Sequence, residues 1–373
     1  MFAVLSALSL AIFTGCNKSQ PQVSEAAIDV IKDMNSDILI EKIDKSEYDG
    51  FSGDLTPMEA VSDDTASGME NAEETTETDL NDFSIENTLP ADDGARIICW
   101  GDSLTEGTGG GGVNYPDVLA ELSGRKVLNY GVYAERASLI AGRQGGNPQH
   151  VEEISQIPAA VTPVKVNVVG DNGDWEMWCN NGDAGINPCS IAGVLGELSI
   201  DTNDGSRYFT RLKAGEAVEV SSENNRFETH AMKDMRDNDI LVIWAGSSDG
   251  LFDDRSIDTV VNHIKSMIKY AGCSRYVIIN YTAKFNIGDA IDEWNTRLQS
   301  EFGDNCLDIR GYLLAQGLSD AGITPTEEDN KCIAEGEIPK SLRSDESHGT
   351  AEFYRIVGEQ VYAKLVALGY IKQ

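Results

Sequence analysis

Residues 97–105 read IICWGDSLT, a short apolar run that passes into a turn and then into residues suited to start a helix. Four consecutive apolar side chains, from Ile97 to Trp100, are typical of a strand buried on both faces of a parallel sheet. The Asp and Ser that follow are common helix caps. We therefore expect a strand-to-helix junction that places Ser103 at the carboxyl edge of a sheet, where open α/β folds carry their sites.

The same pattern of a buried strand followed by a helix recurs along the chain after Gly94. Short apolar runs rich in β-branched residues alternate with segments of helical period. The apolar runs are 127–130, 240–244, 277–280 and 306–309, and the helical segments are 115–122, 256–271, 290–302 and 351–368. Doubly apolar strands that alternate with helices predict an α/β domain over residues 94–373, with a parallel sheet covered on both faces.

One interval, residues 151–226, departs from this pattern. Apolar and polar residues alternate there, with frequent Gly, Asn and Asp turns, which predicts antiparallel strands. The expected strands are 164–168, 191–200, 208–212 and 217–220. Two Asp/Asn/Gly clusters, 171–174 and 201–205, lack the full ligand spacing of a calcium loop, and we interpret them as hairpin turns. The interval is expected to be a β-rich insertion that serves as a lid, a binding module or a dimer contact.

A second motif lies near the other end of the chain, where residues 344–349 read SDESHG and open the last helix. A serine hydroxyl becomes a good nucleophile when a base takes its proton, and a carboxylate must orient that base. Asp345 and His348 are close enough in sequence for His348 Nδ1 to meet Asp345 while Nε2 faces Ser103. The alternative is a helix-capping Asp beside an incidental surface His, as in most isolated D-x-x-H matches.

Together, the Gly-Asp-Ser-Leu stretch and the D-x-x-H stretch resemble the first and last motifs of the GDSL, or SGNH, hydrolase family of esterases and acyl hydrolases. The resemblance runs over about residues 95–368, interrupted by the insertion. It implies a three-layer α/β/α fold with a parallel, flavodoxin-like five-stranded sheet. It also implies that Ser103 is the nucleophile, that Asp345 and His348 complete its triad, and that no metal or organic cofactor is needed.

Two intermediate motifs differ from the family's pattern. Where the family supplies a glycine N–H to the oxyanion hole, residues 129–135 (NYGVYAE) place Ala134. Where the family has Gly-x-Asn-Asp, residues 246–249 read GSSD, with Ser248 in place of asparagine. We expect the N–H groups of Ser103 and Ala134 to bind the oxyanion with help from Ser248. Losing one such donor typically lowers turnover by about 100–1000-fold.

The surroundings of the site carry further expectations. Asn114 and Ser247 are candidates to replace the amide donor. The run GTGGGG, residues 107–112, is not a phosphate loop, because no Gly-Lys-Ser/Thr follows it, and we interpret it as a flexible wall of the active cleft. In the insertion, Trp175 and Trp178 are either a sugar-stacking platform or half-buried strand aromatics.

The first sixteen residues differ from the rest of the chain. Their apolar run is too short to span a bilayer comfortably and suits a signal-peptide core. The ending Phe-Thr-Gly-Cys resembles a bacterial lipobox, so we expect residues 1–16 to be a lipoprotein signal peptide with Cys16 lipidated. The alternative is an ordinary signal peptide with an incidental cysteine. Residues 17–93 are acidic and poor in large hydrophobes, which predicts a disordered tether.

Composition limits the partners of this chain. Its 373 residues include 29 basic and 62 acidic side chains, a net charge of −33. Nucleic-acid phosphates attract Lys and Arg clusters, so we expect no nucleic-acid partner, and membrane contact through the lipid anchor only. Cys179 and Cys189 flank a Gly/Asn/Pro-rich loop and are candidates for a local disulfide. The sequence has no CxxC motif and no Cys/His cluster, so we expect no zinc site. The oligomeric state stays open.

These patterns predict a lipid-anchored, extracytoplasmic serine esterase that removes an acyl group, such as acetyl, from a carbohydrate or another cell-envelope substrate. Two alternatives stay open. One is a lysophospholipase or thioesterase, which also falls within the family's range. The other is a surface carbohydrate-binding protein on the same scaffold, favoured by the substitutions at Ala134 and Ser248 and opposed by the intact Ser/Asp/His set.

Overall fold

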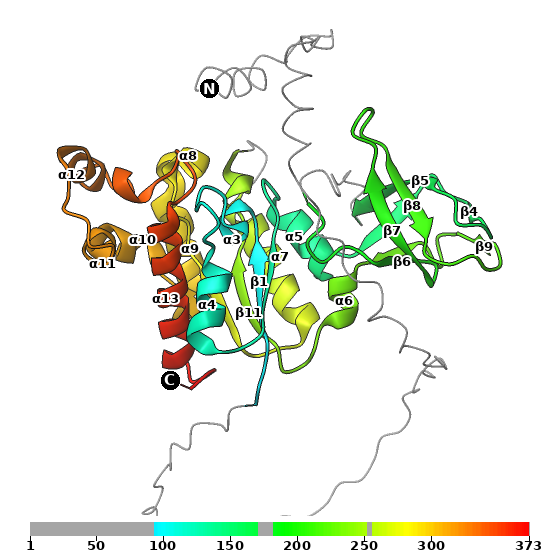
Figure 1. Cartoon of the computed structure of the whole chain (residues 1–373), viewed down its shortest axis with the longest axis horizontal. Coiled ribbons are helices and arrows are strands. Elements are labelled where there is room, and N and C mark those ends of the chain that lie inside the picture. Colours follow the sequence, from blue (N-terminus) through cyan, green and yellow to red (C-terminus); the bar gives the residue numbers. More distant parts are fainter. Residues whose placement is uncertain (1–92, 171–181, 252–255, 373) are drawn as a thin grey trace, which may run out of the picture. The chain divides into compact units, whose positions relative to one another are not determined.

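The computed structural model describes residues 93–170, 182–251 and 256–372 (Figure 1). Five strands form a parallel sheet in the order β13-β12-β11-β1-β2. They are β1 (Ile97–Gly101), β2 (Val127–Gly131), β11 (Ile240–Trp244), β12 (Tyr276–Ile279) and β13 (Cys306–Leu307). Counted along the chain, this is the flavodoxin-like order 2-1-3-4-5, with the first strand beside the switch point where such folds bind ligands. The expected fold class is confirmed.

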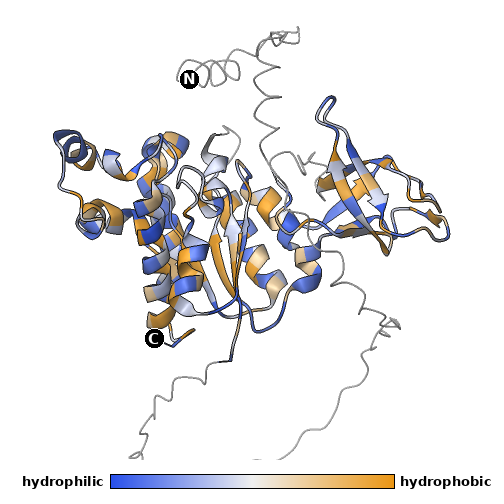
Figure 2. Cartoon of the chain, viewed as in Figure 1, coloured by the Kyte–Doolittle hydropathy of each residue, from blue (hydrophilic) through white to orange (hydrophobic). Residues whose placement is uncertain are grey.

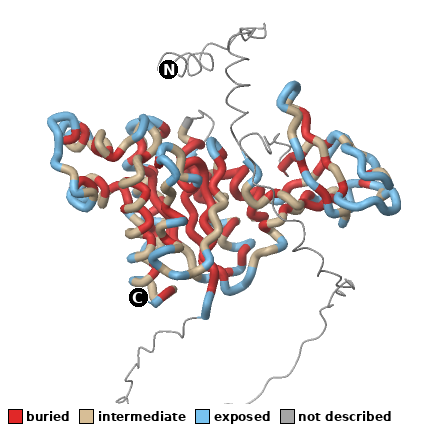
Figure 3. The backbone as a smooth tube through the Cα atoms, in the orientation of Figure 1, coloured by how far each residue is buried: buried red, intermediate tan, exposed pale blue. Residues whose placement is uncertain are grey.

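The inner strands β1, β11 and β12 are buried on both faces because their alternate side chains enter two separate cores. Cys99 and Val242 belong to one core, while Ile98, Trp100 and Leu241 belong to the other. Figure 3 shows buried backbone through the centre of the sheet, and Figure 2 shows hydrophobic residues concentrated on the strands and on one side of the flanking helices. Continuous apolar runs are therefore the sequence pattern that this double burial requires.

Helices cover both faces of the sheet and complete three layers. One core contains side chains of α4 (Tyr115–Ser123) and α13 (Ala351–Ala367), and the other contains α5 (Ala137–Gln144), α7 (Ile257–Ala271) and α9 (Ile291–Phe302). The shorter helices are α3 (Ser103–Glu106), α6 (His230–Asp234), α8 (Lys284–Ile287), α10 (Ile309–Tyr312), α11 (Leu318–Asp320) and α12 (Glu327–Ala334). Short 3-10 or π turns are η2 (Ser248–Leu251), η3 (Gly288–Ala290), η4 (Gly303–Asn305), η5 (Leu313–Gly317) and η6 (Lys340–Leu342).

Helix α5 is absent from the sequence prediction. All of its residues are buried, including Ser138, Arg143 and Gln144. A helix without a solvent-facing side has no alternation of polar and apolar residues at helical period, so periodicity does not reveal it.

The insertion is a closed antiparallel barrel with the strand order β10-β3-β5-β8-β7-β6. Its strands are β3 (Gln149–Glu152), β5 (Val164–Gly170), β6 (Cys189–Ile191), β7 (Val194–Ile200), β8 (Arg207–Arg211) and β10 (Arg226–Glu228). Pairing of β10 with both β3 and β6 closes the circle. A separate pair joins β4 (Gln156–Ile157) to β9 (Val218–Glu219). The barrel thus coincides with the expected insertion, 151–226, and extends two residues beyond it at each end.

One predicted strand of the insertion is wrong. The stretch 191–200 is not a single strand, because a tight turn divides it into β6 and β7, which pair with each other. Ala192 and Gly193 have φ values of 50° and 74°. Positive φ at both central residues gives a two-residue turn of the kind that matches the twist of a hairpin. The Asp-rich stretch 201–205 connects β7 to β8 as the expected turn.

Several predictions fall outside the described residues. These are the signal peptide and Cys16, the acidic tether except for its last residue, the turn at 171–174, Cys179, and the two tryptophans of the insertion. The Cys179–Cys189 disulfide therefore stays a prediction. In the three described ranges, no helix is long and apolar enough to cross a membrane.

Candidate active site

Ser103 lies at the carboxyl end of β1, as the first residue of α3. Asp102 caps this helix, because its side chain accepts a hydrogen bond from the Leu104 N–H at 3.0 Å. The capping geometry explains why the Asp-Ser order follows the strand directly. Ser103 is 7% exposed, so its hydroxyl is held in a largely dry position that substrate can still reach.

Asp345 and His348 meet Ser103 from the opposite end of the sequence. His348 Nε2 is 2.9 Å from Ser103 Oγ, and His348 Nδ1 is 2.8 Å from Asp345 Oδ2. Asp345 Oδ1 accepts the backbone N–H groups of Ser347 and His348 at 2.7 and 2.8 Å. The turn therefore uses one carboxylate oxygen to hold its own backbone and the other to orient the imidazole. All three residues predicted for the triad are brought together.

The electrostatics keep the Asp345 carboxylate ionised. Partial burial opposes its charge, but hydrogen bonds from the His348 side chain and from the Ser347 and His348 backbone outweigh burial and lower the pKa of Asp345 to about 2. A carboxylate charged at neutral pH can hold the imidazole with Nδ1 protonated and Nε2 free to accept a proton.

The residue before the nucleophile, Asp102, is a buried carboxylate that holds the Ser103 turn by hydrogen bonds. Asp102 is fully buried, and it accepts hydrogen bonds from the Ser247 hydroxyl and from the Ser248 backbone N–H as well as from Leu104. Burial raises the pKa of the Asp102 carboxyl above its ordinary value, and the hydrogen bonds from its partners oppose that rise. Asp102 therefore ties the turn after β11 to the turn that carries Ser103.

The expected oxyanion residues surround the same corner of the sheet. Ala134 follows β2 and has a φ of 58°, the left-handed region. Glycine is favoured in that region because it lacks a Cβ, which accounts for the glycine expected at this position. Ser248 begins η2 after β11 and is 6% exposed.

Both candidate replacements for the missing amide already make hydrogen bonds in the structure. The Ser247 hydroxyl donates to Asp102. The Asn114 amide is used in capping α4, where Oδ1 accepts the Asp117 N–H at 2.8 Å and Nδ2 donates to the Asp117 carboxylate at 2.7 Å. Asp102 therefore engages the hydroxyl hydrogen of Ser247, and Asp117 engages one of the two amide hydrogens of Asn114.

Part of the glycine run after α3 is a packed contact: Gly109 and Gly110 lie against neighbouring atoms, whereas Gly111 and Gly112 are open. A Cβ placed on Gly109 would lie 2.0 Å from Ser344 Oγ and 2.9 Å from the Gly349 carbonyl oxygen. The Tyr354 hydroxyl donates to the Thr108 carbonyl at 2.6 Å. The run therefore fastens the nucleophile's helix to the turn that carries the other two triad residues.

Sequence reasoning missed an ion pair beside the oxyanion loop. Glu135 follows Ala134 and is 5% exposed, and Arg143 on α5 is fully buried. Their charged groups are 2.7 Å apart, and Arg143 also donates to the carbonyl oxygens of Tyr130 and Ala184 at 2.9 and 2.6 Å. A Glu and an Arg eight residues apart have no motif spacing, so only the fold pairs them.

No protein-family model matches the chain. Among curated proteins, a tail spike protein of Salmonella phage epsilon15 is 26% identical over 208 residues, which cover 51% of this chain. The chain spans only 18% of the length of that relative. With so small a share matched, the relative assigns no activity to this chain.

Solved structures with a similar fold include two proteins assigned to the G-D-S-L family of lipolytic proteins. The one from Desulfitobacterium hafniense is 16% identical, with a TM-score of 0.38 over 73% of this chain and 99% of its own. The one from Veillonella parvula is 11% identical, with a TM-score of 0.34 over 74% and 97%. A peptidoglycan O-acetylesterase is also 11% identical, with a TM-score of 0.34 over 74% and 93%. At these low scores the likeness carries no argument, and the three-layer α/β/α fold class rests on the sheet order and the flanking helices themselves.

Proposed function

We propose that this protein is a serine esterase in which Ser103, His348 and Asp345 form the catalytic triad. The single observation that carries the proposal is the continuous hydrogen-bond chain from Ser103 Oγ through both imidazole nitrogens to Asp345 Oδ2. The chain lies at the carboxyl edge of a parallel sheet, where such folds place their sites. A nucleophile, a base within hydrogen-bond reach and a group that orients the base are the parts that acyl transfer requires.

The reaction follows from this arrangement. Ser103 Oγ attacks the ester carbonyl carbon while its proton passes to His348 Nε2. The tetrahedral oxyanion is stabilised by the N–H groups of Ser103 and Ala134 and by Ser248. The alcohol leaves with the proton from His348, and an acyl group stays on Ser103. Water then attacks this acyl-enzyme, gives a proton to His348, and releases the acid as Ser103 recovers its hydrogen.

The substrate and the location are further parts of the proposal. We infer an ester of a carbohydrate or another cell-envelope molecule, with acetyl as the simplest acyl group. The support is the signal-like sequence before Cys16 and the acidic stretch after it, which together suit a lipid anchor and a tether outside the cytoplasm. The chain needs no metal or organic cofactor for the steps above.

Covalent labelling tests the mechanism. A fluorophosphonate probe should label the folded wild-type protein, and Ser103→Ala should remove both the label and the hydrolysis of p-nitrophenyl acetate. Hydrolysis that persists unchanged in pure Ser103→Ala protein would show that another group does the chemistry. A chain-length series of acyl esters separates the lysophospholipase or thioesterase alternative, which requires a steep preference for long chains.

A carbohydrate-binding protein without activity is the second candidate. The observations in its favour are the left-handed Ala134 and the serine at position 248, where the family has glycine and asparagine. Wild-type protein that is folded, takes no fluorophosphonate label and binds acylated sugars would support this candidate against the esterase.

A further inference from the structure

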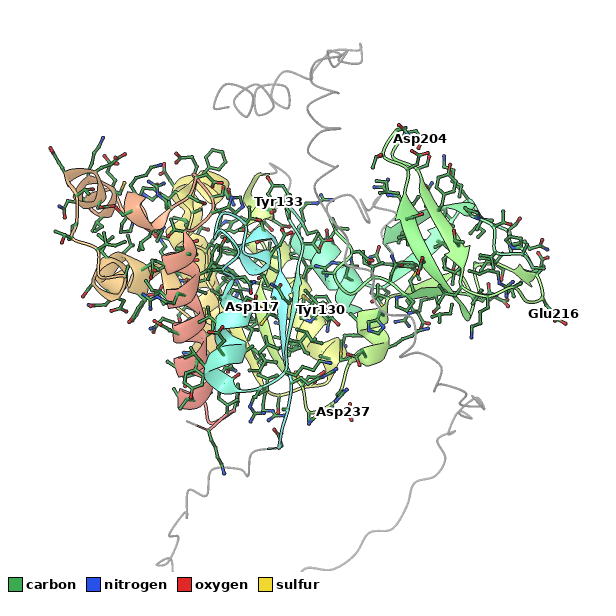
Figure 4. All side chains as sticks on the ribbon, viewed as in Figure 1. Asp117, Tyr130, Tyr133, Asp204, Glu216 and Asp237 are labelled. Atoms are coloured by element: carbon green, nitrogen blue, oxygen red, sulfur yellow. The ribbon has the colours of Figure 1, made fainter. Side chains whose placement is uncertain are left out.

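An exposed aromatic ring lies beside the triad imidazole. Tyr133 stacks on His348, with ring centroids 6.0 Å apart and ring planes 28° apart. The tyrosine is 45% exposed, and it lies on the loop after β2 that also carries Ala134 (Figure 4). A single exposed tyrosine needs no functional explanation. Tyr133 differs because its ring touches the side chain that must reach the substrate.

An exposed carboxylate accompanies this ring. Glu106 ends α3, the helix that begins with Ser103. Its carboxylate accepts hydrogen bonds from the Tyr133 backbone N–H and from the Thr108 hydroxyl, the latter at 3.3 Å, and it interacts electrostatically with His348. Because a carboxylate accepts several hydrogen bonds, Glu106 retains capacity for donors from a ligand.

The chemistry of the site fixes which part of an ester meets these two side chains. In acyl transfer the imidazole gives its proton to the leaving alcohol, so the alcohol oxygen must come within hydrogen-bond reach of His348 Nε2. The alcohol part therefore extends past the imidazole. Tyr133 stacks on the imidazole, Glu106 interacts with it electrostatically, and both residues are open to solvent.

The chemical character of this corner defines what it binds. An aromatic face packs against the C–H groups of a saturated ring, and a carboxylate accepts the hydroxyl groups at the rim of such a ring. Glu106 and Asp345 make the surroundings negative, which disfavours a phosphate or carboxylate on the alcohol by like-charge repulsion. This combination suits a neutral hydroxylated ring.

We propose that Tyr133 and Glu106 form the subsite for the alcohol part of the ester, and that this alcohol is an uncharged carbohydrate. The inference rests on the proposed function, since it takes His348 as the acid that protonates the leaving group. Such a subsite favours carbohydrate esters over lysophospholipids, because a lysophospholipid carries an anionic phosphate and has no sugar ring to stack on Tyr133.

Selectivity between two acetyl esters tests the role of Tyr133. The measured quantity is kcat/KM for an O-acetylated methyl glycoside divided by kcat/KM for ethyl acetate. Tyr133→Ala should lower this ratio by about 10-fold, the loss expected from one ring contact. Tyr133→Phe should keep the ratio, because the stacking face remains. Tyr270→Ala, which removes a tyrosine that is 39% exposed at the far end of α7, is the matched control and should also keep it.

A charged ligand tests Glu106 separately. The wild type should prefer the neutral acetyl glycoside over the acetyl ester of a uronic acid. Glu106→Gln should raise kcat/KM for the anionic ester by roughly 3- to 10-fold, because it removes one like charge and keeps an acceptor oxygen. No gain for the anionic ester would overturn the assignment of Glu106.

Direct binding separates this inference from the proposed function. Unacetylated methyl glycoside, titrated into the protein in a calorimeter, should bind the wild type more tightly than Tyr133→Ala whether or not any ester is hydrolysed. Equal binding, together with an unchanged selectivity ratio, overturns the subsite and leaves the esterase standing. Glycoside binding in a protein that takes no fluorophosphonate label overturns the esterase and keeps the subsite.

Discussion

Ala134 has a backbone conformation that its side chain disfavours. At a φ of 58°, the Cβ of an L-residue crowds the following carbonyl, which costs roughly 1–2 kcal/mol, whereas glycine adopts this region freely. Glycine also has more conformational entropy in the unfolded chain than alanine, which offsets about half of the stabilisation gained by removing this strain. We therefore expect Ala134→Gly to raise the free energy of unfolding in urea by about 0.5–1 kcal/mol.

The matched control for this substitution is an exposed alanine in a right-handed helix. Ala363 lies in α13, and Ala363→Gly should lower the free energy of unfolding by about 1 kcal/mol. Opposite signs for the two substitutions would support the conformational explanation. A loss of stability in Ala134→Gly would contradict it.

Asp345 sets the orientation and tautomer of His348 through a bond of 2.8 Å. Asp345→Asn keeps the shape but puts an amide in place of an acceptor, which favours the wrong imidazole tautomer. We expect kcat to fall by about 10³–10⁴-fold with a small change in KM. Steady-state kinetics on p-nitrophenyl acetate would measure the changes in kcat and KM separately.

Glu346 provides the control for Asp345 because it is the adjacent carboxylate and bonds Arg343 at 3.4 Å instead of the imidazole. Glu346→Gln should leave kcat within about twofold, as expected for an exposed ion pair that contributes little. A similar loss in both variants would show that negative charge in the turn, and not the bond to Nδ1, is what matters.

At the scale of elements, close backbone approach joins the glycine run to the Asp345–His348 turn. A methyl group at Gly109 would push against Ser344 and the Gly349 carbonyl, which flank the two triad residues. Gly109→Ala should lower the free energy of unfolding by about 2 kcal/mol more than Gly111→Ala. Both glycines have positive φ, at 83° and 63°, so backbone strain is shared.

Gly111 is the control because no atom lies within 4 Å of a Cβ built there. Gly109→Ala should also lower kcat by at least about 10-fold, since small misplacements of catalytic groups are costly. Denaturation and kinetics on the two variants measure these effects. Equal kcat values for both would show that the turn holds its geometry without this contact.

At the scale of the whole described unit, one buried arginine joins the insertion to the α/β part. Arg143 on α5 binds Glu135 beside the oxyanion loop and the Ala184 carbonyl in the insertion, and its own carbonyl accepts the Thr229 hydroxyl at 2.6 Å. Arg143→Met leaves Glu135 buried without its cation. We expect a loss of about 3–5 kcal/mol in the free energy of unfolding by urea.

The pH dependence of that loss has a definite sign. Burial raises the pKa of Glu135 above its ordinary 4.5, against the opposing pull of Arg143. Without Arg143 the folded protein favours protonated Glu135 still more strongly, so the penalty is small below about pH 4.5 and grows as the pH rises above it. The loss in Arg143→Met should therefore be smaller at pH 4 than at pH 8. Glu135→Gln combined with Arg143→Met should recover part of the stability at pH 8, and no recovery would contradict this account.

Secondary structure was predictable wherever burial leaves a periodic or continuous pattern. The five strands of the sheet and the helices α4, α7, α9 and α13 lie within two residues of their expected bounds. Prediction missed α5, which has no polar face, and α12, and it joined β6 and β7, whose turn contains an alanine where Asn or Gly is usual. For α5 and for the hairpin, the tertiary surroundings override local preference.

The sequence by itself determined the α/β fold class and the two motifs that carry Ser103, Asp345 and His348. Strands buried on both faces need continuous apolar runs, and a catalytic triad needs particular side chains. Both requirements are therefore visible in the sequence. Only the tertiary structure decided which groups meet across long separations. It joined Tyr133 to His348 and Glu135 to Arg143, and it showed that Asn114 and Ser247 are already engaged. Such contacts depend on side-chain direction and distance, which local sequence spacing does not encode.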